Sequence, residues 1–279
     1  MTTISIRNVW KEYDERVVLE RINLEIESRA FVALVGPSGC GKTTFLRMLL
    51  SEESPTRGDI LIDGKPIAGE PTAERGVVFQ RYSVFPHLTV LGNVLLALEF
   101  EKGGVLARLF GTARRKAIEE ARAMLDCVGL GGNEKKYPAQ LSGGMQQRLA
   151  LAQTLIRKPK VLLLDEPFGA LDPGIRGDIH ALMRRLWNEE ELTVVMVTHD
   201  LSEAFGLATR VIAFERPRLD PVDGDRYGAV IKDDIEVWPR RIAGQPSPHR
   251  DETKSITAPG RDDPAPDQGQ ARDDLALPA

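Results

Sequence analysis

The sequence contains only two cysteines, Cys40 and Cys127, among its 279 residues. Two such thiols give no disulfide framework of the kind that small secreted domains use, and they suit a reducing compartment. Cys40 lies in a glycine-rich loop ahead of a predicted helix, where a lowered thiol pKa would allow redox regulation. The alternative, a small residue that fits a tight loop, needs no such chemistry.

Long apolar runs are also absent. No segment approaches the ~18–20 apolar residues that a helix needs to cross a bilayer. The first six residues, MTTISI, lack a basic region followed by an apolar one, so we expect no signal peptide. Any role at a membrane is therefore predicted to be peripheral.

The chain has no excess of positive charge, because 37 Lys and Arg face 41 Asp and Glu for a net charge of −4. A protein that binds nucleic acid non-specifically is usually basic, so we expect no nucleic-acid partner. Hydrophobic residues make up 42% and charged residues 28% of the chain, a globular composition able to form one large domain or two modest ones.

The most informative feature that is present is a glycine-rich loop matching the pattern G-x-x-x-x-G-K-[ST]. Its residues are Gly36, Pro37, Ser38, Gly39, Cys40, Gly41, Lys42, Thr43 and Thr44. An apolar run, Phe31–Val35, precedes the loop, and apolar residues at helical spacing follow it from Phe45. This is the strand–loop–helix context that a phosphate-binding loop requires.

The chemistry of the loop follows from its residue types. Its glycines allow backbone conformations closed to other residues, so that successive N–H groups form a nest for an anion. The helix that follows adds the positive end of its dipole. Lys42 would place a charge on the outer phosphates, and the Thr43 hydroxyl would ligate Mg²⁺. The loop therefore predicts a nucleotide site.

Two adjacent carboxylates, Asp165 and Glu166, follow the apolar run Val161–Leu164. Open parallel sheets bind ligands at the C-terminal ends of their strands, which is where these residues are expected. Asp165 would hold Mg²⁺ and Glu166 would act as general base on the attacking water. By themselves, two acidic residues are equally compatible with an exposed strand end.

A third motif, Leu141–Gln147, reads LSGGMQQ and leads into a predicted helix. Ser142 can cap this helix, and the free N–H groups of the first turn can bind an anion. Spacing alone does not distinguish an anion site from an ordinary capped helix.

The fold class is predicted from the order of elements. Residues 4–35 read as β, with strands expected at Ile4–Ile6, Val17–Leu19, Ile22–Ile26 and Phe31–Val35. Residues 88 to about 133 read as mostly helical, with Gly103–Thr112 as an interruption and with Ile118, Ala121, Leu125 and Val128 on one apolar face of Arg114–Leu130. Strands alternate with helices after Lys160. We predict an α/β P-loop NTPase with a mostly parallel sheet flanked by helices, an added antiparallel β layer and a helical subdomain at about 88–157. This domain would span 1–239, and the polar segment 240–279 is expected to be a disordered tail.

Taken in order, the motifs resemble the ATP-binding subunit of an ABC transporter, over residues 4 to about 215. Those that carry the resemblance are Gly36–Thr44, Gln80, Leu141–Gln147, Val161–Glu166, Ala170–Asp172 and Thr198–Asp200.

The resemblance implies further roles. Tyr13 would stack on adenine, although a half-buried strand tyrosine is an alternative, and Gln80 would contact Mg²⁺ and the water and sense the membrane partner. His199 would hydrogen-bond the γ-phosphate, and Asp172 would link two sites across a dimer. The residues expected to close on the γ-phosphate bound by the opposite subunit are Ser142, Gly143, Gly144 and Gln146.

It also implies partners. Two copies would hold two ATP molecules, with Mg²⁺, between the loop of one chain and the LSGGMQQ helix of the other. Separate integral membrane permease subunits, and indirectly a solute-binding protein, would complete an importer at the cytoplasmic side of the inner membrane. The segment Arg81–Val90 would receive the permease, unless its aromatic residues form subdomain core.

Among importers, the chain most resembles the nitrate, sulfonate, taurine and bicarbonate class, with some support from Asp225–Ala229 and the strand predicted after it. Two alternatives stay open, the soluble ATPase subunit of an exporter and an ABC ATPase with no transport role. The solute itself is not encoded in these motifs.

Overall fold

The structure, a computed structural model, describes residues 2–14, 16–79, 84–102, 109–169, 171–216 and 227–237. The contacts divide the chain into two units, Met1–Arg240 and Arg241–Ala279, and every described residue lies in the first. The segment predicted as a polar tail therefore lies outside the described residues.

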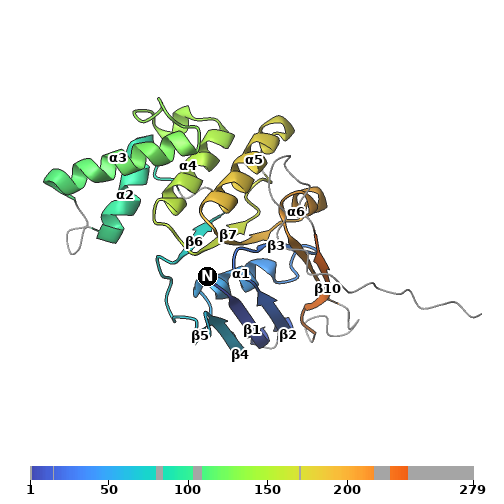
Figure 1. The fold of residues 1–279 in the computed structure, drawn as a ribbon. Coiled ribbons are helices and arrows are strands. Elements are labelled where there is room, and N and C mark those ends of the chain that lie inside the picture. The colour runs from blue at the N-terminus through green and yellow to red at the C-terminus, as the bar shows by residue number, and fades with distance from the viewer. Residues whose placement is uncertain are drawn as a thin grey trace, which may run out of the picture. The chain divides into compact units, whose positions relative to one another are not determined.

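A six-stranded sheet forms the centre of this unit (Figure 1). Its order is β10-β9-β3-β8-β7-β6, and all neighbours pair in parallel except β10, which runs antiparallel to β9. The central strands are continuous apolar runs because both faces of a parallel sheet are covered. The strands are β3 (Phe31–Val35), β6 (Arg75–Val78), β7 (Val161–Asp165), β8 (Thr193–Val197), β9 (Arg210–Glu215) and β10 (Val230–Glu236).

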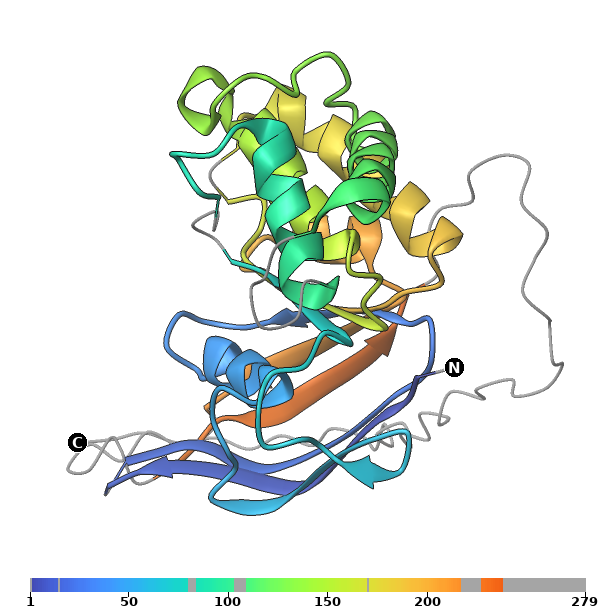
Figure 2. The same cartoon turned by 90° about the vertical axis from the view of Figure 1, so that its left-hand side faces the viewer.

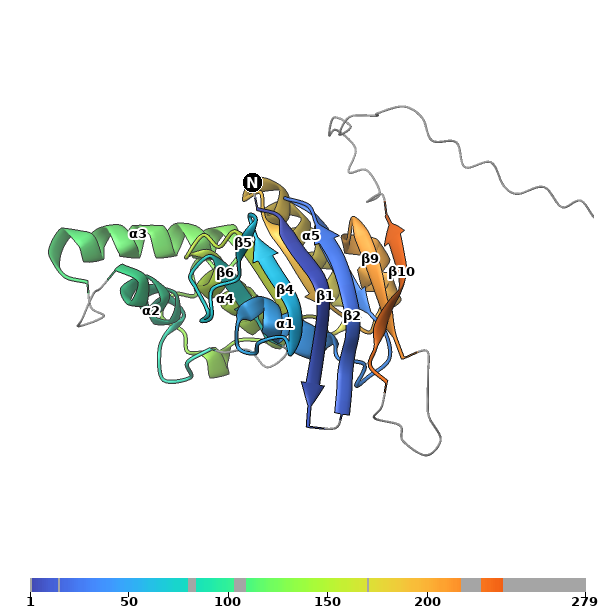
Figure 3. The same ribbon diagram turned by 90° about the horizontal axis from the view of Figure 1, so that it is seen from below.

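A second sheet of four antiparallel strands has the order β2-β1-β4-β5. Figure 3 shows β4, β1 and β2 side by side. Buried and exposed residues alternate along much of β2, as expected when one face of a sheet meets the core and the other meets water. The strands are β1 (Ile4–Tyr13), β2 (Arg16–Ile26), β4 (Arg57–Ile62) and β5 (Lys65–Pro66).

Helix α1 (Lys42–Leu50) lies between the two sheets (Figure 2). Its buried Phe45 and Leu46 belong to one hydrophobic cluster with Val32 and Leu34 of β3. Phe31, Ala33 and Val35 belong instead to the cluster under the other helices. The alternation along β3 therefore holds the phosphate loop, which joins β3 to α1, between two packed layers.

The remaining helices lie on the other side of the parallel sheet, where α2 and α3 pack against α4 (Figures 1 and 2). They are α2 (Val90–Lys102), α3 (Gly111–Cys127), α4 (Gly143–Leu155), α5 (Pro173–Glu189), α6 (Leu201–Leu207) and the short 3₁₀ helix η2 (Pro138–Gln140). Of the apolar face predicted for α3, Ala121, Leu125 and Val128 are buried, whereas Ile118 is partly exposed.

The predicted fold class is confirmed, with two local differences. Strand β1 continues to Tyr13, far beyond the expected Ile4–Ile6. The strand is irregular from Asn8 onward, because Asn8 has a φ of 48° and the pairing with β2 shifts register there. Such a bulge breaks the alternation that marks a strand in a sequence. Helix α3 already begins at Gly111, within the predicted interruption, and residues 103–108 lie outside the described residues.

Candidate nucleotide site

An open cavity of about 530 Å³ lies over the phosphate loop. It brings together three separate parts of the chain: the β1–β2 hairpin, the loop with the start of α1, and the end of β7. The lining residues are Tyr13, Arg16, Val18, Ser38, Gly39, Gly41, Lys42, Thr43, Thr44, Arg47 and Glu166. Gly36, Pro37 and Cys40, also predicted to bind nucleotide, are not among them.

Glycine is required at two points of the loop. At Gly36, with φ of 146°, a Cβ would stand 2.3 Å from the carbonyl oxygen of Phe214 on β9. Gly41 caps α1 with φ of 94°, and a Cβ there would stand 2.8 Å from the Leu19 side chain. The loop is therefore pressed against both sheets, and its conformation suits only residues without a side chain.

Lys42 is the first residue of α1, and its side chain folds back over the loop. Its Nζ donates hydrogen bonds to the carbonyl oxygens of Gly36 at 2.8 Å and Pro37 at 2.9 Å. These carbonyls position a cation that is only 6% exposed. The buried Cys40 thiol, whose Sγ lies 3.7 Å from Lys42 Nζ, fills the inside of the loop, which favours its interpretation as a small packing residue.

Thr43 meets Asp165 across the gap between α1 and β7. The Thr43 hydroxyl donates to Asp165 Oδ1 at 3.2 Å. Burial raises the pKa of the Asp165 carboxyl above its usual range, and the negative charge of Glu166 adds to this, while the Thr43 bond opposes it. A hydroxyl and a carboxylate are thus held together beside the loop.

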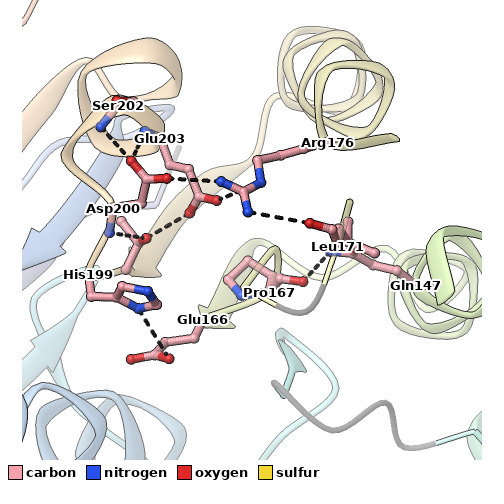
Figure 4. A network of polar contacts seen from close by, with 10 residues as sticks. Gln147, Glu166, Pro167, Leu171, Arg176, His199, Asp200, Ser202 and Glu203 are labelled. Carbon is pink, nitrogen blue, oxygen red and sulfur yellow. Dashed lines mark hydrogen bonds and ion pairs between the residues drawn. The ribbon is translucent and has the colours of Figure 1, made fainter. Parts of the chain in front are cut away.

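Glu166 and His199 lie in contact at the ends of neighbouring strands β7 and β8 (Figure 4). His199 Nδ1 is 3.4 Å from Glu166 Oε2. Glu166 has a φ of 45°, and its backbone N–H donates to the carbonyl of Val197 at 2.9 Å. Two residues singled out separately in the sequence are therefore neighbours in space.

A partly buried ion-pair network supports the loop that carries His199 (Figure 4). Arg176 Nη1 is 3.0 Å from Asp200 Oδ2, and its Nε is 3.6 Å from Glu203 Oε1. Glu203 is 3% exposed and accepts a hydrogen bond from the Thr198 hydroxyl at 2.7 Å. Burial raises the pKa of Glu203, and the charge of Arg176 opposes this rise.

Sequence reasoning missed this network. Asp200 accepts hydrogen bonds from the N–H groups of Ser202 and Glu203 and so caps α6. The spacing D-x-x-E at Asp200–Glu203 is the signal that could have marked a helix start there. No local pattern, however, links Arg176 to either carboxylate.

Tyr13 lies at the rim of the cavity, 41% exposed. Its hydroxyl donates to Glu53, which also pairs with Lys11 and Arg47. Burial and the Glu53 carboxylate raise the pKa of Tyr13. The ring is thereby fixed in place with one face against Lys11 Nζ, 4.7 Å from its centre.

The LSGGMQQ residues do not line this cavity. Ser142 caps α4 by accepting a bond from the N–H of Met145 at 3.4 Å, and both Ser142 and Gly143 are exposed, whereas Gly144 is buried. Gln146 donates to the carbonyls of Pro138 and Leu141 at 3.0 and 3.4 Å.

Asp172, likewise exposed and outside the cavity lining, precedes α5 as its N-terminal cap residue. Gln80 and the segment 81–83 lie outside the described residues, as does Ala170. Within the described ranges, no three His, Cys, Asp or Glu side chains cluster as a ready-made metal site. The helices described there also include none that is long and apolar enough to cross a membrane.

Comparison with known proteins identifies the family. The sequence model of the ABC transporter family matches residues 19–169. An uncharacterized ABC transporter ATP-binding protein of Methanocaldococcus jannaschii is 43% identical over 219 residues, covering 78% of this chain and 76% of that protein.

Two import proteins are also similar. The spermidine/putrescine import ATP-binding protein PotA of Spiroplasma citri is 45% identical and the match covers 78% of this chain and 61% of PotA. The sulfate/thiosulfate import ATP-binding protein CysA of Pseudomonas putida is 40% identical, with 79% and 66% covered. The chain thus spans less than two thirds of the length of these two relatives.

Solved structures agree with the sequence matches. The dimeric structure of MJ0796, a bacterial ABC transporter cassette, is 30% identical, with a TM-score of 0.68 over 85% of this chain and 100% of that one. A dimeric post-hydrolysis state of the same cassette, bound to ADP and Pi, gives a TM-score of 0.67. The chain belongs to the ABC transporter family and is one of its ATPase cassettes.

Proposed function

We propose that this chain hydrolyses ATP as one half of a sandwich of two copies and so powers solute import through a separate membrane permease. The observation that carries the proposal is the division of the site. One cavity gathers the phosphate loop, Tyr13 and Glu166, while Ser142 and Gly143 are exposed elsewhere on the same chain. A second copy would supply what each cavity lacks.

Nucleotide binding follows from the residues around the cavity. The N–H groups of the loop and the dipole of α1 bind the phosphates, with the Lys42 ammonium as counter-charge. Tyr13 stacks on the adenine ring, a role that its fixed position at the cavity rim supports. Glu53 assists by holding the tyrosine hydroxyl.

The residues beside the loop fit a magnesium ion. Mg²⁺ takes oxygen ligands and is commonly held by one or two protein groups together with substrate phosphates. The Thr43 hydroxyl and the Asp165 carboxylate form such a pair, and their mutual contact places both oxygens together. The predicted third contact is Gln80. When bound, the ion would neutralise charge on the phosphates.

Glu166 is the group placed to activate water. Its carboxylate accepts a proton as the water oxygen bonds to the γ-phosphorus, and the bond from that phosphorus to the β–γ bridging oxygen breaks to release ADP. His199, 3.4 Å from Glu166, both steadies this carboxylate and hydrogen-bonds the γ-phosphate. The chemistry thus needs positioned groups and no covalent intermediate.

The partner's α4 closes the site. Ser142 and Gly143, which are exposed, offer a hydroxyl and backbone N–H groups at a helix N-terminus, and Gly144 continues that first turn, which suits a phosphate bound by the other chain. Gln146, whose amide donates to the carbonyls of Pro138 and Leu141, would hold the first turn of α4 in position. Asp172 would connect the two nucleotide sites. The dimeric assembly of the similar cassette MJ0796 supports the arrangement.

Import is favoured by the printed functions of the relatives, which import polyamines or sulfate and thiosulfate. Permease subunits would bind this chain at the cytoplasmic face of the membrane, and a solute-binding protein would deliver the solute. The nitrate, sulfonate, taurine and bicarbonate class stays a prediction from the sequence alone.

Reconstitution tests the proposal. The chain would be co-purified with its membrane permease subunits and placed in vesicles with ATP inside. Labelled sulfate, taurine, nitrate and spermidine would be offered outside with the solute-binding protein. If the chain powers import, one labelled solute should accumulate inside vesicles that contain the wild-type chain, and none should accumulate with Glu166→Gln. ATP-dependent loss of preloaded solute would instead indicate export, and a permease that leaves the ATPase rate unchanged would contradict a transport role.

A further inference from the structure

Gln147 is a buried polar residue on α4 that none of the roles above uses. Its side chain is 0% exposed, and its Nε2 donates a hydrogen bond to the carbonyl of Pro167 at 2.6 Å (Figure 4). Its Oε1 has no hydrogen-bond partner among the described residues. The side chain therefore makes one strong contact and leaves one buried acceptor unpaired.

The contact is made directly beside the proposed general base. Pro167 follows Glu166, whose φ of 45° lies in the left-handed region that non-glycine residues rarely adopt. Such a conformation costs on the order of 1–3 kcal/mol and persists only where the surroundings impose it. The N–H of Glu166 donates to the carbonyl of Val197, and the carbonyl of the following residue, Pro167, accepts from Gln147.

Two further contacts hold the same turn. The Phe168 ring is fully buried and packs edge-on against His180, with ring centres 4.8 Å apart. The carbonyl of Leu171 accepts a bond from Arg176 Nη2 at 3.4 Å. The turn after Glu166 is thus held from α5 by His180 and Arg176, and from α4 by Gln147.

The unpaired oxygen limits what Gln147 contributes to stability. Leaving a buried acceptor without a partner costs about 1–3 kcal/mol, whereas a hydrogen bond contributes about 1 kcal/mol net. An apolar side chain of similar volume would remove the unpaired Oε1 but would leave the buried Pro167 carbonyl without its donor, so the two costs largely offset each other. The specific effect of the glutamine amide is therefore on the position of the Pro167 carbonyl.

We infer that Gln147 is a positioning residue for Glu166: it holds the Pro167 carbonyl, and with it the backbone that aims the Glu166 carboxylate, from the helix that begins with Ser142. The inference rests on the proposed function, in which Glu166 is the base. The base of one nucleotide site is thereby tied to the helix that contributes to the other.

The test replaces the amide by a thioether of similar size, Gln147→Met. We expect kcat for ATP to fall between about tenfold and a hundredfold, because misplacing a catalytic group by ~1 Å costs this much. KM for ATP and the Kd for a non-hydrolysable analogue should stay within about twofold, since no nucleotide-binding group changes. Tm should change little, because the variant removes one unpaired buried acceptor, Gln147 Oε1, and leaves another, the Pro167 carbonyl, without its donor.

Gln153→Met is the matched control. Gln153 lies on the same helix, and its Nε2 donates to Asn93 Oδ1 at 3.0 Å, away from Glu166. Its kcat should equal that of the wild type. An unchanged kcat in Gln147→Met, or a fall in kcat accompanied by an equal fall in the control, would overturn the inference.

A double variant separates this inference from the proposed function. If Gln147 acts through Glu166, then adding Gln147→Met to Glu166→Gln should not lower the residual single-turnover rate further. A further tenfold drop would show that Gln147 acts independently of Glu166. Full activity of Glu166→Gln alone would instead refute the base assignment itself.

Discussion

The phosphate loop and the start of α4 are both glycine-containing helix N-termini, yet they are held in different ways. The loop is pressed between two sheets, and its lysine is 6% exposed and bonded to two carbonyls of the loop. At the start of α4, Ser142 and Gly143 are exposed, and the Ser142 hydroxyl accepts a hydrogen bond from the N–H of Met145 in its own helix.

The N-terminus of α1, with its loop, therefore lines a cavity of its own chain, whereas the N-terminus of α4 presents its polar groups to solvent. Backbone N–H groups at either end suit an anion. The cavity, however, lies over the loop, and its lining takes in Glu166, the proposed general base, and Tyr13 from the same chain. The exposed N-terminus of α4 is therefore suited to a ligand that is bound to a second protein molecule.

The largest expected effect concerns the loop side. Glu166→Gln should lower the ATPase rate by about 10²–10⁴-fold, because the amide cannot accept the proton of the attacking water. ATP binding should persist, so the variant should accumulate as an ATP-bound dimer in size-exclusion chromatography. Turnover at the wild-type rate would show that Glu166 is not the base.

The next effect concerns the support of His199. Arg176→Met leaves the buried Glu203 carboxylate without its cation, and breaking such a pair costs about 3 kcal/mol of unfolding free energy. Burial already holds the pKa of Glu203 above its unfolded value, and without Arg176 that pKa rises further. Stability should therefore be lost mainly at neutral pH and recover as falling pH protonates the carboxyl.

Denaturant unfolding at pH 7 and pH 5 would measure this loss. Lys160→Met is the control, since its ion pair with Glu74 lies on the surface and should contribute little. A loss equal at both pH values would argue that Arg176 acts by packing rather than by charge.

A smaller effect is expected at the cavity rim. Tyr13→Leu should weaken ATP binding by about tenfold, since stacking of a base on an aromatic ring contributes about 1–3 kcal/mol. Tyr13→Phe keeps the ring and should lose much less. Calorimetric titration with ATP and with inorganic tripolyphosphate would separate base from phosphate contacts, and a weaker tripolyphosphate affinity in the leucine variant would contradict stacking.

A further prediction is a pH dependence of stability at His180. Burial, with the positive charges of Arg184 and Arg176, lowers its pKa to about 4, against the opposing charge of Asp200. The unfolded chain therefore binds a proton between about pH 6.5 and 4 that the folded chain does not, so stability falls as pH drops through this window. His180→Phe should flatten that fall, measured by thermal unfolding across the window, and an unchanged slope would assign the fall to other groups.

The motifs that the sequence predicted are those made of consecutive residues. The loop at Gly36–Thr44 and the carboxylates at Asp165 and Glu166 each carry their context in neighbouring residues, namely a strand before them and a turn or helix after. The resemblance of the motifs to a known family placed His199 near this site, and the structure puts it beside Glu166.

What the sequence did not predict depends on contacts between distant segments. Arg176 reaches Asp200 and Glu203 from another helix, and Gln147 reaches Pro167 across 20 positions of the chain. Neither contact leaves a periodic trace. The bulge at Asn8 hid most of β1 for a related reason, because it removes the alternation on which strand prediction depends.

The claim that two chains share each active site is tested most directly by mixing two inactive variants. Lys42→Ala removes the loop cation, and Ser142→Arg blocks the start of α4. Each pure variant should be inactive, whereas an equal mixture should regain activity, since a mixed dimer contains one loop and one α4 that are both intact. Restored ATPase activity in the mixture is the predicted result. A mixture as inactive as its components, with mixed dimers verified by differential tags, would contradict the account.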